Sequence, residues 1–353
     1  MKNLLIITQK VDENDDLLGF FVGWLREFSK KFDKVFVITL AKGDCDLPEN
    51  VFIYSLGKEK NSSRLTRFVR FYWHLFRLVP RSNGVFAHMS PIFAIMVWPA
   101  AAIFRKRIIL WYLHRSVTRR LKIAEKLSYK IVTSTAESLN IKSRKIVEIG
   151  HGIDIGRFRS LRPVGPMGQN GPVRILSVGR ISKIKDYETL VRAAKILKDK
   201  GFDFNLKIVG RPVMSYDLEY FESLKKLVQD LGLENEIKFV GFVPYSRIAD
   251  YYKESDIFVN LAPKGGIDKA VLEAMASGSL VLAANEAFKR YFGRFGRVLV
   301  FTHGVPNDLA QKIEDLLNLL NENWGDIVTF LQRSVEKNHS VQGAVDRISR
   351  LFA

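Results

Sequence analysis

Two cationic side chains in the second half of the sequence follow a predicted strand at a spacing suited to holding phosphate. Gly179 and Arg180 come directly after the β-type run Arg174–Val178, and Lys185 lies five residues beyond Arg180, where a helix begins. A guanidinium and an ammonium beside a helix N-terminus can neutralise a diphosphate, because unpaired backbone N–H groups there add partial positive charge. A solvated basic turn is the alternative interpretation.

A glycine-bearing loop precedes a second helix further along the chain. Gly265, Gly266, Ile267 and Asp268 lead into the helix that carries Glu273. Glycine lets backbone N–H groups come close to a ligand, and one carboxylate can accept hydrogen bonds from two ribose hydroxyls. Taken alone, Glu273 is more simply explained as an exposed helical residue.

Two histidines in the first half end predicted strands. His88 follows the run Gly84–Ala87, and His114 follows Ile108–Tyr112. An imidazole can exchange a proton near neutral pH, but taken alone His114 is more simply a structural histidine. For His88, contact with an acceptor and packing both remain open.

The sequence has no strong metal or disulfide pattern. Asp44 and Asp46 match an Asp-x-Asp metal signature, but they lie in an acidic loop far along the chain from the other candidates. Cys45 is the only cysteine, so no intrachain disulfide can form and nothing points to an oxidising compartment. We therefore expect no bound metal and a cytoplasmic location.

The elements that must position these residues alternate between strand and helix. In the first half, predicted strands are Leu4–Thr8, Val35–Leu40, Val51–Ser55, Gly84–Ala87, Ile108–Tyr112 and Ile131–Ser134. In the second half they are Arg174–Val178, Asn205–Val209, Glu236–Val240, Ile257–Asn260, Leu280–Ala283 and Val298–Phe301. Strands alternating with helices predict parallel sheets covered on both faces.

The length of 353 residues and a proline- and glycine-rich segment at 162–171 predict two domains. We expect one Rossmann-like domain at residues 1–163 and a second at residues 164–335. Residues 336–353 are predicted to form a helix that crosses back to the first domain. Two doubly wound α/β domains facing across a cleft would bind a ligand between them.

The charge balance points to an anionic partner. Lys and Arg number 55 against 37 Asp and Glu, a net charge of +18. The segment Lys58–Arg81 holds seven basic residues and one acid, interleaved with aromatic residues. It is explained equally well as a helix lying on an anionic membrane and as an ordinary amphipathic helix. No nucleic-acid-binding motif accompanies the charge.

An uncharged run at Val85–Phe104 is long enough to cross a bilayer on length alone. His88, Pro91 and Pro99 interrupt it. We therefore predict a buried strand followed by a buried helix. The N-terminal run before the acidic residues Asp12–Asp16 is interpreted as a first strand and not as a signal peptide.

Taken together, these motifs resemble glycosyltransferase family 4, whose members have the GT-B fold and transfer sugars from nucleotide donors with retention of configuration. The motifs in the second half are Ser177–Arg180 with Lys185, Phe239–Val243, Tyr252 with Ser255–Val259, and Leu272–Gly278. Those in the first half are Gly19–Phe21 and His151–Asp154 with Phe158.

The resemblance implies that residues 1–163 form the acceptor-side domain and residues 164–335 the nucleotide-sugar domain. It also implies a role for each matching residue. Arg180 and Lys185 would bind the donor diphosphate, and Glu273 would hold the ribose. His114 would lie near the donor sugar. The remaining donor contacts implied are Gly19, Gly179, Phe242, Val243, Gly266 and Ile267.

One departure from the family pattern concerns a carboxylate. The family has a glutamate eight positions before the ribose-binding one, and here that position is Gly265. Either Asp268 supplies the missing carboxylate, or other groups bind the sugar hydroxyls, or the protein has lost its activity.

We interpret the sequence as a retaining, metal-independent glycosyltransferase of the hexosyl type. The resemblance implies a UDP-, GDP- or ADP-sugar as donor substrate and no cofactor. The acceptor is expected to be a saccharide or lipid-linked saccharide in surface polysaccharide biosynthesis, with the protein peripheral at the inner face of the membrane. The alternative is a catalytically silent relative that binds nucleotide sugar as a regulatory or scaffold subunit.

Overall fold

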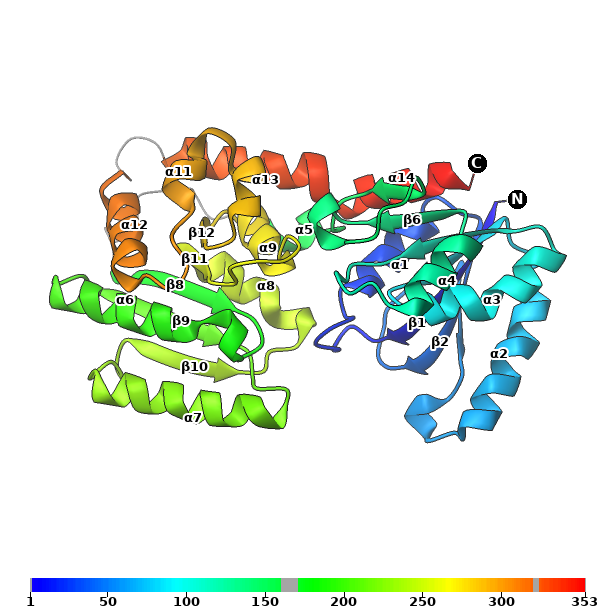
Figure 1. Ribbon diagram of the computed structural model, residues 1–353, viewed down its shortest axis with the longest axis horizontal. Coiled ribbons are helices and arrows are strands. Elements are labelled where there is room, and N and C mark those ends of the chain that lie inside the picture. The colour runs from blue at the N-terminus through cyan, green and yellow to red at the C-terminus, as the bar shows by residue number, and fades with distance from the viewer. Residues whose placement is uncertain (1, 160–170, 320–323, 353) are drawn as a thin grey trace. The chain divides into compact units, whose positions relative to one another are not determined.

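The computed structural model describes residues 2–159, 171–319 and 324–352 (Figure 1). The chain divides into two compact units. The first comprises Met1–Asp154, Pro244–Ser246 and Asn338–Ala353, and the second comprises Ile155–Val243 and Arg247–Lys337. The boundary predicted between residues 163 and 164 lies outside the described residues. Each unit is a parallel α/β structure, as the strand and helix alternation predicts.

The first unit contains a parallel sheet of seven strands in the order β3-β2-β1-β4-β5-β6-β7. These strands are β1 Asn3–Val11, β2 Lys34–Lys42, β3 Val51–Ser55, β4 Gly84–His88, β5 Arg107–Trp111, β6 Lys130–Thr133 and β7 Ile146–Glu148. The first six match the predicted strands. β7 was not predicted, because an edge strand of three residues is too short to show an alternating pattern.

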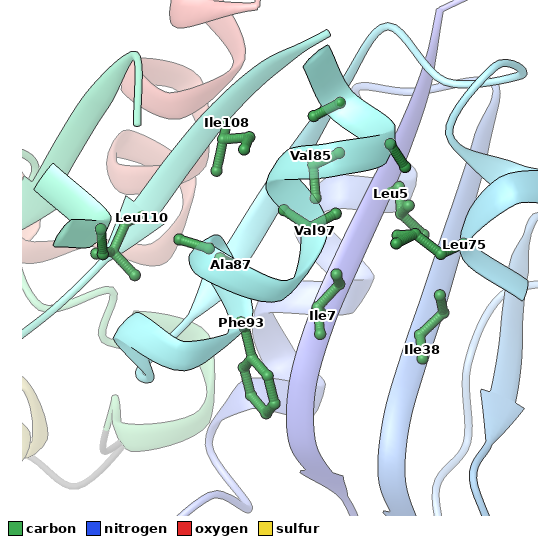
Figure 2. Close-up of a cluster of buried hydrophobic side chains, with 14 of the residues drawn as sticks. Leu5, Ile7, Ile38, Leu75, Val85, Ala87, Phe93, Val97, Ile108 and Leu110 are labelled. Atoms are coloured by element: carbon green, nitrogen blue, oxygen red, sulfur yellow. The ribbon is translucent and has the colours of Figure 1, made fainter. Parts of the chain in front are cut away.

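Helices cover both faces of this sheet. Those helices are α1 Phe21–Ser29, α2 Arg64–Leu78, α3 Pro91–Ile103, α4 Arg119–Leu127 and α14 Val341–Leu351. Figure 2 shows Phe93 and Val97 of α3 against Ile7 and Val85 of the sheet. Side chains of α2 and α4 belong to the same buried cluster, so α2, α3 and α4 share one face. α1 and α14 pack on the opposite face.

The uncharged run at Val85–Phe104 forms β4 and α3, as predicted. β4 is buried along its whole length, and α3 buries one face in the cluster of Figure 2. Among the described residues, no helix combines the length and the apolar character needed to span a membrane.

The C-terminal segment divides at Ser340. α13 spans Trp324–His339, and the Ser340 side chain then accepts a hydrogen bond from the backbone N–H of Gly343 at 3.3 Å. This N-cap begins α14. The helix predicted over residues 336–353 is thus two helices, the second of which packs on α1 in the first unit.

The second unit contains a parallel sheet of five strands in the order β10-β9-β8-β11-β12. The strands are β8 Val173–Val178, β9 Phe204–Val209, β10 Ile237–Gly241, β11 Ile257–Asn260 and β12 Leu280–Ala283. Five of the six predicted strands are confirmed. The strand predicted at Val298–Phe301 is wrong, because Val298 and Leu299 lie in α11 and only Val300 bridges to the sheet, at Ala283.

The remaining helices surround or follow this sheet. They are α5 Ile155–Phe158, α6 Tyr187–Asp199, α7 Ser215–Asp230, α8 Tyr245–Glu254, α9 Lys269–Ser277, α10 Lys289–Phe292, α11 Gly296–Leu299 and α12 Pro306–Leu319. α6 and α12 pack together, while α9 follows β11 and contacts it. α9 therefore starts at the carboxyl end of a central strand, where the candidate residues gather.

Candidate active site

The strand order of the second unit reverses between β8 and β11. β8 pairs with β9 on one side and with β11 on the other. Parallel strands part at such a point and their following loops diverge, which leaves a ligand-sized crevice at the carboxyl ends. The segment Gly179–Lys185 follows β8, and the segment Leu261–Asp268 follows β11. The two motifs found in the sequence therefore meet at one place in the sheet.

An ion pair joins these two segments directly. The Lys185 Nζ lies 2.5 Å from Asp268 Oδ2, and Asn260 donates a hydrogen bond to the same oxygen at 3.0 Å. The other carboxylate oxygen of Asp268 accepts from the backbone N–H of Ala270 at 3.2 Å and so caps α9. Asp268 thus ties the β8 loop, the end of β11 and the start of α9 together.

The environment keeps Asp268 ionised. Burial alone would raise the pKa of its carboxyl group, but the charge of Lys185 and hydrogen bonds from Lys185, Asn260 and Ala270 outweigh burial. The pKa of Asp268 is consequently lower than its ordinary value. The site contains a fixed negative charge paired with a cation that a ligand phosphate would also attract.

The turn after β8 is closely packed. A side chain at Gly210, which follows β9, would come within 1.9 Å of the backbone oxygen of Gly179. Gly210 also has a φ of +143°. The buried Tyr187 hydroxyl donates to the same Gly179 oxygen at 3.2 Å. The backbone leading to Arg180 is fixed from both sides, while the Arg180 side chain itself is exposed.

Gly265 occupies a conformation that glycine favours. Its φ is +134°, and no atom lies within 4 Å of the position that a Cβ would take. There is room for a side chain, but the backbone geometry disfavours one. Of the two residues that follow, Gly266 is partly exposed and Ile267 is buried in the unit.

Glu273 is buried, so its interpretation as an exposed helical glutamate is wrong. The side chain is 5% exposed. Tyr252 donates a hydrogen bond to Glu273 Oε2 at 3.0 Å, and Lys269 Nζ lies 3.1 Å from Oε1. A carboxylate has about four lone-pair sites and can accept several hydrogen bonds at once. Sequence reasoning did not foresee Asn260, Tyr252 or Lys269 as partners.

The candidates for contact with the base follow the edge strand β10. Gly241 ends the strand with a φ of +81°, and Phe242 is then 40% exposed. The guanidinium of Arg211 lies 4.7 Å from the centre of the Phe242 ring. Val243 follows and is partly exposed. An exposed aromatic ring beside a guanidinium provides a flat surface suited to stacking.

In the first unit, the strand order reverses between β1 and β4. His88 at the end of β4 is 1% exposed, and its Nδ1 lies 2.9 Å from the Thr8 hydroxyl of β1. Its ring stacks on Phe21 with centroids 3.7 Å apart. Burial lowers the pKa of His88 to about 3, which keeps the imidazole neutral. These contacts favour packing over direct contact with an acceptor.

Gly19 lies in the loop that follows β1. A Cβ at this position would lie 2.6 Å from the backbone oxygen of Asp15 and 2.9 Å from Cβ of Tyr245. The backbone of Gly19 also donates to the Asp15 oxygen at 3.1 Å. Only glycine allows this close approach, so the loop depends on residue 19 for its shape.

His114 lies between β5 and α4 and is exposed. Its Nδ1 accepts a hydrogen bond from the backbone N–H of Ser116 at 3.0 Å. The structure therefore does not bring His114 and His88 into one cluster, because His88 is enclosed in the core. The starts of α3 and α4 and the end of β5 line a cavity of about 410 Å³. Its lining residues are Ser90, Pro91, Ile92, Tyr112, Thr118, Arg119 and Arg120. The sequence analysis did not single out Arg119 or Arg120 as site residues.

No acidic or histidine cluster stands out as a metal site in the part of the chain that the structure describes. Groups of three or more His, Cys, Asp or Glu side chains arranged for a metal ion do not occur among these residues. The Asp-x-Asp pair at Asp44 and Asp46 has no such third partner there. Metal independence stays a prediction.

Comparisons with known proteins show what the sequence and the fold resemble. Residues 168–326 match the family model for glycosyl transferases group 1, which covers the part of the chain that holds Lys185, Asp268 and Glu273. An uncharacterized glycosyltransferase of Haemophilus influenzae is 30% identical over 203 residues, 54% of this chain and 55% of that protein. The amylovoran biosynthesis glycosyltransferase AmsK of Erwinia amylovora is 33% identical over 168 residues, 44% of this chain and 38% of that protein.

The chain thus spans about half or less of the length of these curated relatives. Similarity to a solved structure extends further. The crystal structure of Anabaena HepE in complex with UDP has a TM-score of 0.74 at 18% identity, covering 99% of each chain. The fold, two parallel-sheet α/β units, is that of GT-B glycosyltransferases.

Proposed function

We propose that this protein is a retaining glycosyltransferase of family 4 that transfers a sugar from a nucleotide diphosphate sugar to an acceptor hydroxyl. The observation that carries the proposal is the Lys185–Asp268 pair at the strand-order reversal of the second unit. That unit holds most of the segment matching the group 1 family model. A cation fixed at the carboxyl ends of central strands suits a diphosphate.

The donor would lie along the carboxyl ends of β8, β11 and β10. Arg180 is exposed and Lys185 is half-buried, so both can approach a diphosphate. Glu273 would accept the ribose hydroxyls while Tyr252 and Lys269 hold its carboxylate in place. Phe242 and Val243 would meet the base. Gly179, Gly266 and Ile267 would supply close backbone contacts.

Transfer would need no protein nucleophile. The acceptor oxygen would form a new bond to the anomeric carbon on the face that the departing nucleotide leaves. The bond between that carbon and the donor phosphate oxygen breaks with its electron pair on the phosphate. That phosphate oxygen would take the acceptor's proton, and Arg180 and Lys185 would stabilise the developing negative charge. This chemistry places no demand on a cofactor.

The acceptor is proposed to be a saccharide or lipid-linked saccharide used to build a surface polysaccharide. The name of AmsK links that relative to amylovoran biosynthesis, which supports this acceptor class. The cavity beside Arg119 and Arg120 could hold a phosphate of such an acceptor, and His114 is exposed at the following loop. His88 is buried and would not contact the acceptor. It would hold β1 and β4 together through its hydrogen bond with Thr8.

A donor screen tests the proposal. Thermal unfolding of the purified protein would be followed with UDP-, GDP- and ADP-sugars, and a matched donor should raise the melting temperature as its concentration exceeds the dissociation constant. The donor found would then be incubated with lipid-linked and free saccharides, and the anomeric configuration of the product determined by NMR. Retained configuration is expected. If the protein binds a donor but neither transfers the sugar nor hydrolyses the donor, it is a catalytically silent relative. A product of inverted configuration would exclude the retaining mechanism.

A further inference from the structure

The helix layer formed by α2, α3 and α4 exposes large apolar side chains that the core does not use. On α2, Phe71, Leu75 and Leu78 face the sheet, and the other side of the helix carries a second apolar stripe. The exposed residues are Leu65, Phe68, Val69, Trp73 and Phe76 on α2 and Ile92, Trp98 and Ile103 on α3. We refer to these eight side chains as the α2–α3 surface.

The apolar stripe on α2 is regular. Leu65, Val69, Tyr72 and Phe76 follow one another at intervals of three or four residues, so they lie on one side of the helix. The exposed fractions of Leu65 and Trp73 are 72% and 58%. The Phe76 and Phe104 rings lie 6.5 Å apart, so the stripe adjoins the end of α3. The two helices are neighbours in Figure 1, and this ring contact joins their apolar side chains at the end of α3.

The outer side of α3 contains no charge. Residues 91–103 include no Lys, Arg, Asp or Glu, although the helix lies on the surface of the unit. Ile103 is 66% exposed and Trp98 is 44% exposed. A helix that is apolar all round is normally covered on every side. Exposure of such a helix marks a surface that meets something apolar.

Positive charge surrounds this surface. Between residues 64 and 127 there are thirteen Lys and Arg and one acid, Glu125. Arg67, Arg70 and Arg77 line the side of α2 next to the apolar stripe, and none of them forms an ion pair with any residue that the structure describes. Arg119, Arg120, Lys122 and Lys126 are exposed on α4. The surroundings therefore suit an anionic partner.

We propose that the α2–α3 surface docks this protein on an anionic lipid bilayer. The apolar side chains enter the boundary between headgroups and acyl chains, and the flanking arginines contact lipid phosphates. A second copy of the chain would bring two strongly basic surfaces together, which like charges oppose. Nucleic acid would offer little to Ile92 and Ile103, whose side chains have no group that can hydrogen-bond to a phosphate or a base. This docking goes beyond sugar transfer and holds whether or not the protein transfers sugar.

Sedimentation with lipid vesicles tests the proposal. The full chain would be mixed with vesicles of phosphatidylcholine alone and with vesicles that also contain phosphatidylglycerol. Binding should require the anionic lipid and weaken as salt rises from about 0.1 M to 1 M, because the screening length falls from about 10 Å to 3 Å. The emission of Trp73 and Trp98 should shift to shorter wavelength on binding, since Trp24 and Trp111 are already buried.

Two pairs of matched variants locate the contact. Phe68→Ser with Trp73→Ser should weaken binding at least tenfold, whereas Tyr216→Ser with Leu218→Ser, at exposed positions on α7, should leave it unchanged. Arg67→Gln with Arg77→Gln should weaken binding about 10- to 30-fold, at about 1 kcal/mol per charge. Arg192→Gln with Arg297→Gln removes the same charge from exposed positions in the second unit and should have little effect.

Circular dichroism would show that each variant is folded. Equal binding to both kinds of vesicle, or equal losses in the matched controls, would overturn the proposal. So would a concentration-dependent dimer that Phe68→Ser with Trp73→Ser abolishes, because the surface would then be an interface between copies. Stronger binding of an oligonucleotide than of anionic vesicles, lost in the same apolar variant, would also overturn it.

Discussion

Asp268 is the residue whose position in the structure most changes its interpretation. The sequence suggests it as a replacement for the glutamate absent at Gly265. In the structure its carboxylate already binds Lys185, Asn260 and the backbone of Ala270. We infer that its first task is to position Lys185 at the reversal of strand order, with contact to the sugar as a second role.

Asp268→Asn should therefore lower transfer by about tenfold or more, because the Lys185 ammonium loses its charged partner. Asparagine is as good an N-cap as aspartate, so α9 should keep its start and the unfolding free energy should change little. Initial-rate measurements at saturating donor, together with donor binding by calorimetry, would separate turnover from affinity. Asp268→Ala removes the cap as well and provides the comparison. Wild-type turnover in Asp268→Asn would contradict the positioning role.

Arg180 tests the leaving-group contact separately, since its side chain is exposed and makes no contribution to the core. Arg180→Ala should reduce turnover by roughly 10²-fold or more while the melting temperature stays the same. Arg211→Ala, on the loop after β9, is a control that changes a nearby arginine contacting Phe242 instead. The assignment fails if Arg180→Ala turns over donor normally at saturation.

His88 gives a prediction for pH. Its pKa is about 3 in the folded protein because burial disfavours the charged ring, and its unfolded value is near 6.5. Between these values the unfolded chain binds the extra proton, so this group makes stability fall as pH falls below about 6.5. His88→Gln removes the titration. Its stability deficit relative to wild type should narrow by up to about 1.4 kcal/mol per pH unit on acidification.

Urea unfolding near pH 7.5 and near pH 5 would measure this difference, with linear extrapolation at each pH. The exposed His114→Gln is the control for simply losing an imidazole. A deficit in His88→Gln that is the same at both pH values would mean that the buried ring does not titrate as its surroundings imply.

At the scale of elements, the regular alternation of apolar runs predicted eleven of the twelve strands found among the described residues, and the restart of the pattern after the central segment. Long buried strands such as β1 and β8 give clear signals because their residues are apolar on both faces. β7 has three residues and gives no signal. Val298–Phe301 is rich in β-branched and aromatic residues, yet its backbone turns through α11 and reaches the sheet only at Val300.

For the candidate site as well, some features could be predicted from the sequence and others could not. The sequence pattern put Arg180 and Lys185 after one strand and Glu273 in the helix that follows the glycine-bearing loop, as the structure has them, but it did not show that β8 and β11 are neighbours. Their partners were not predictable, because Asn260 and Tyr252 come from other elements whose register the sequence does not fix. The enclosure of His88 likewise depends on Thr8 and Phe21, which lie about 70 to 80 residues away in the chain.

The junction of α14 with the first unit gives a prediction at this scale. Ile348 is fully buried among side chains of the first unit. Ile348→Ala should destabilise that unit by roughly 2 to 5 kcal/mol through lost burial and a cavity. Gln342→Ala, on the exposed side of the same helix, should change stability by less than about 0.5 kcal/mol. Hydrogen exchange would show whether the loss appears in β1 and β4, and equal effects of the two variants would contradict the packing described.

At the scale of the whole molecule, the two units are not sequential along the chain. Residues up to Asp154 form most of the first unit, but Asn338–Ala353 belong to it as well, and the second unit is encoded between them. Val341, Val345 and Ile348 pack on the sheet face that carries Phe86, beside Phe28 of α1.

This order has a consequence for biosynthesis. At about 5 to 20 residues per second, a ribosome needs roughly 10 to 40 s to pass from the end of the first segment to α14. During that time the nascent first unit has a sheet face that α1 covers and α14 does not yet cover, while the second unit is being made. The interval is long enough for chaperone engagement or misassembly to compete with folding, so completion of the first unit is timed by translation through α14.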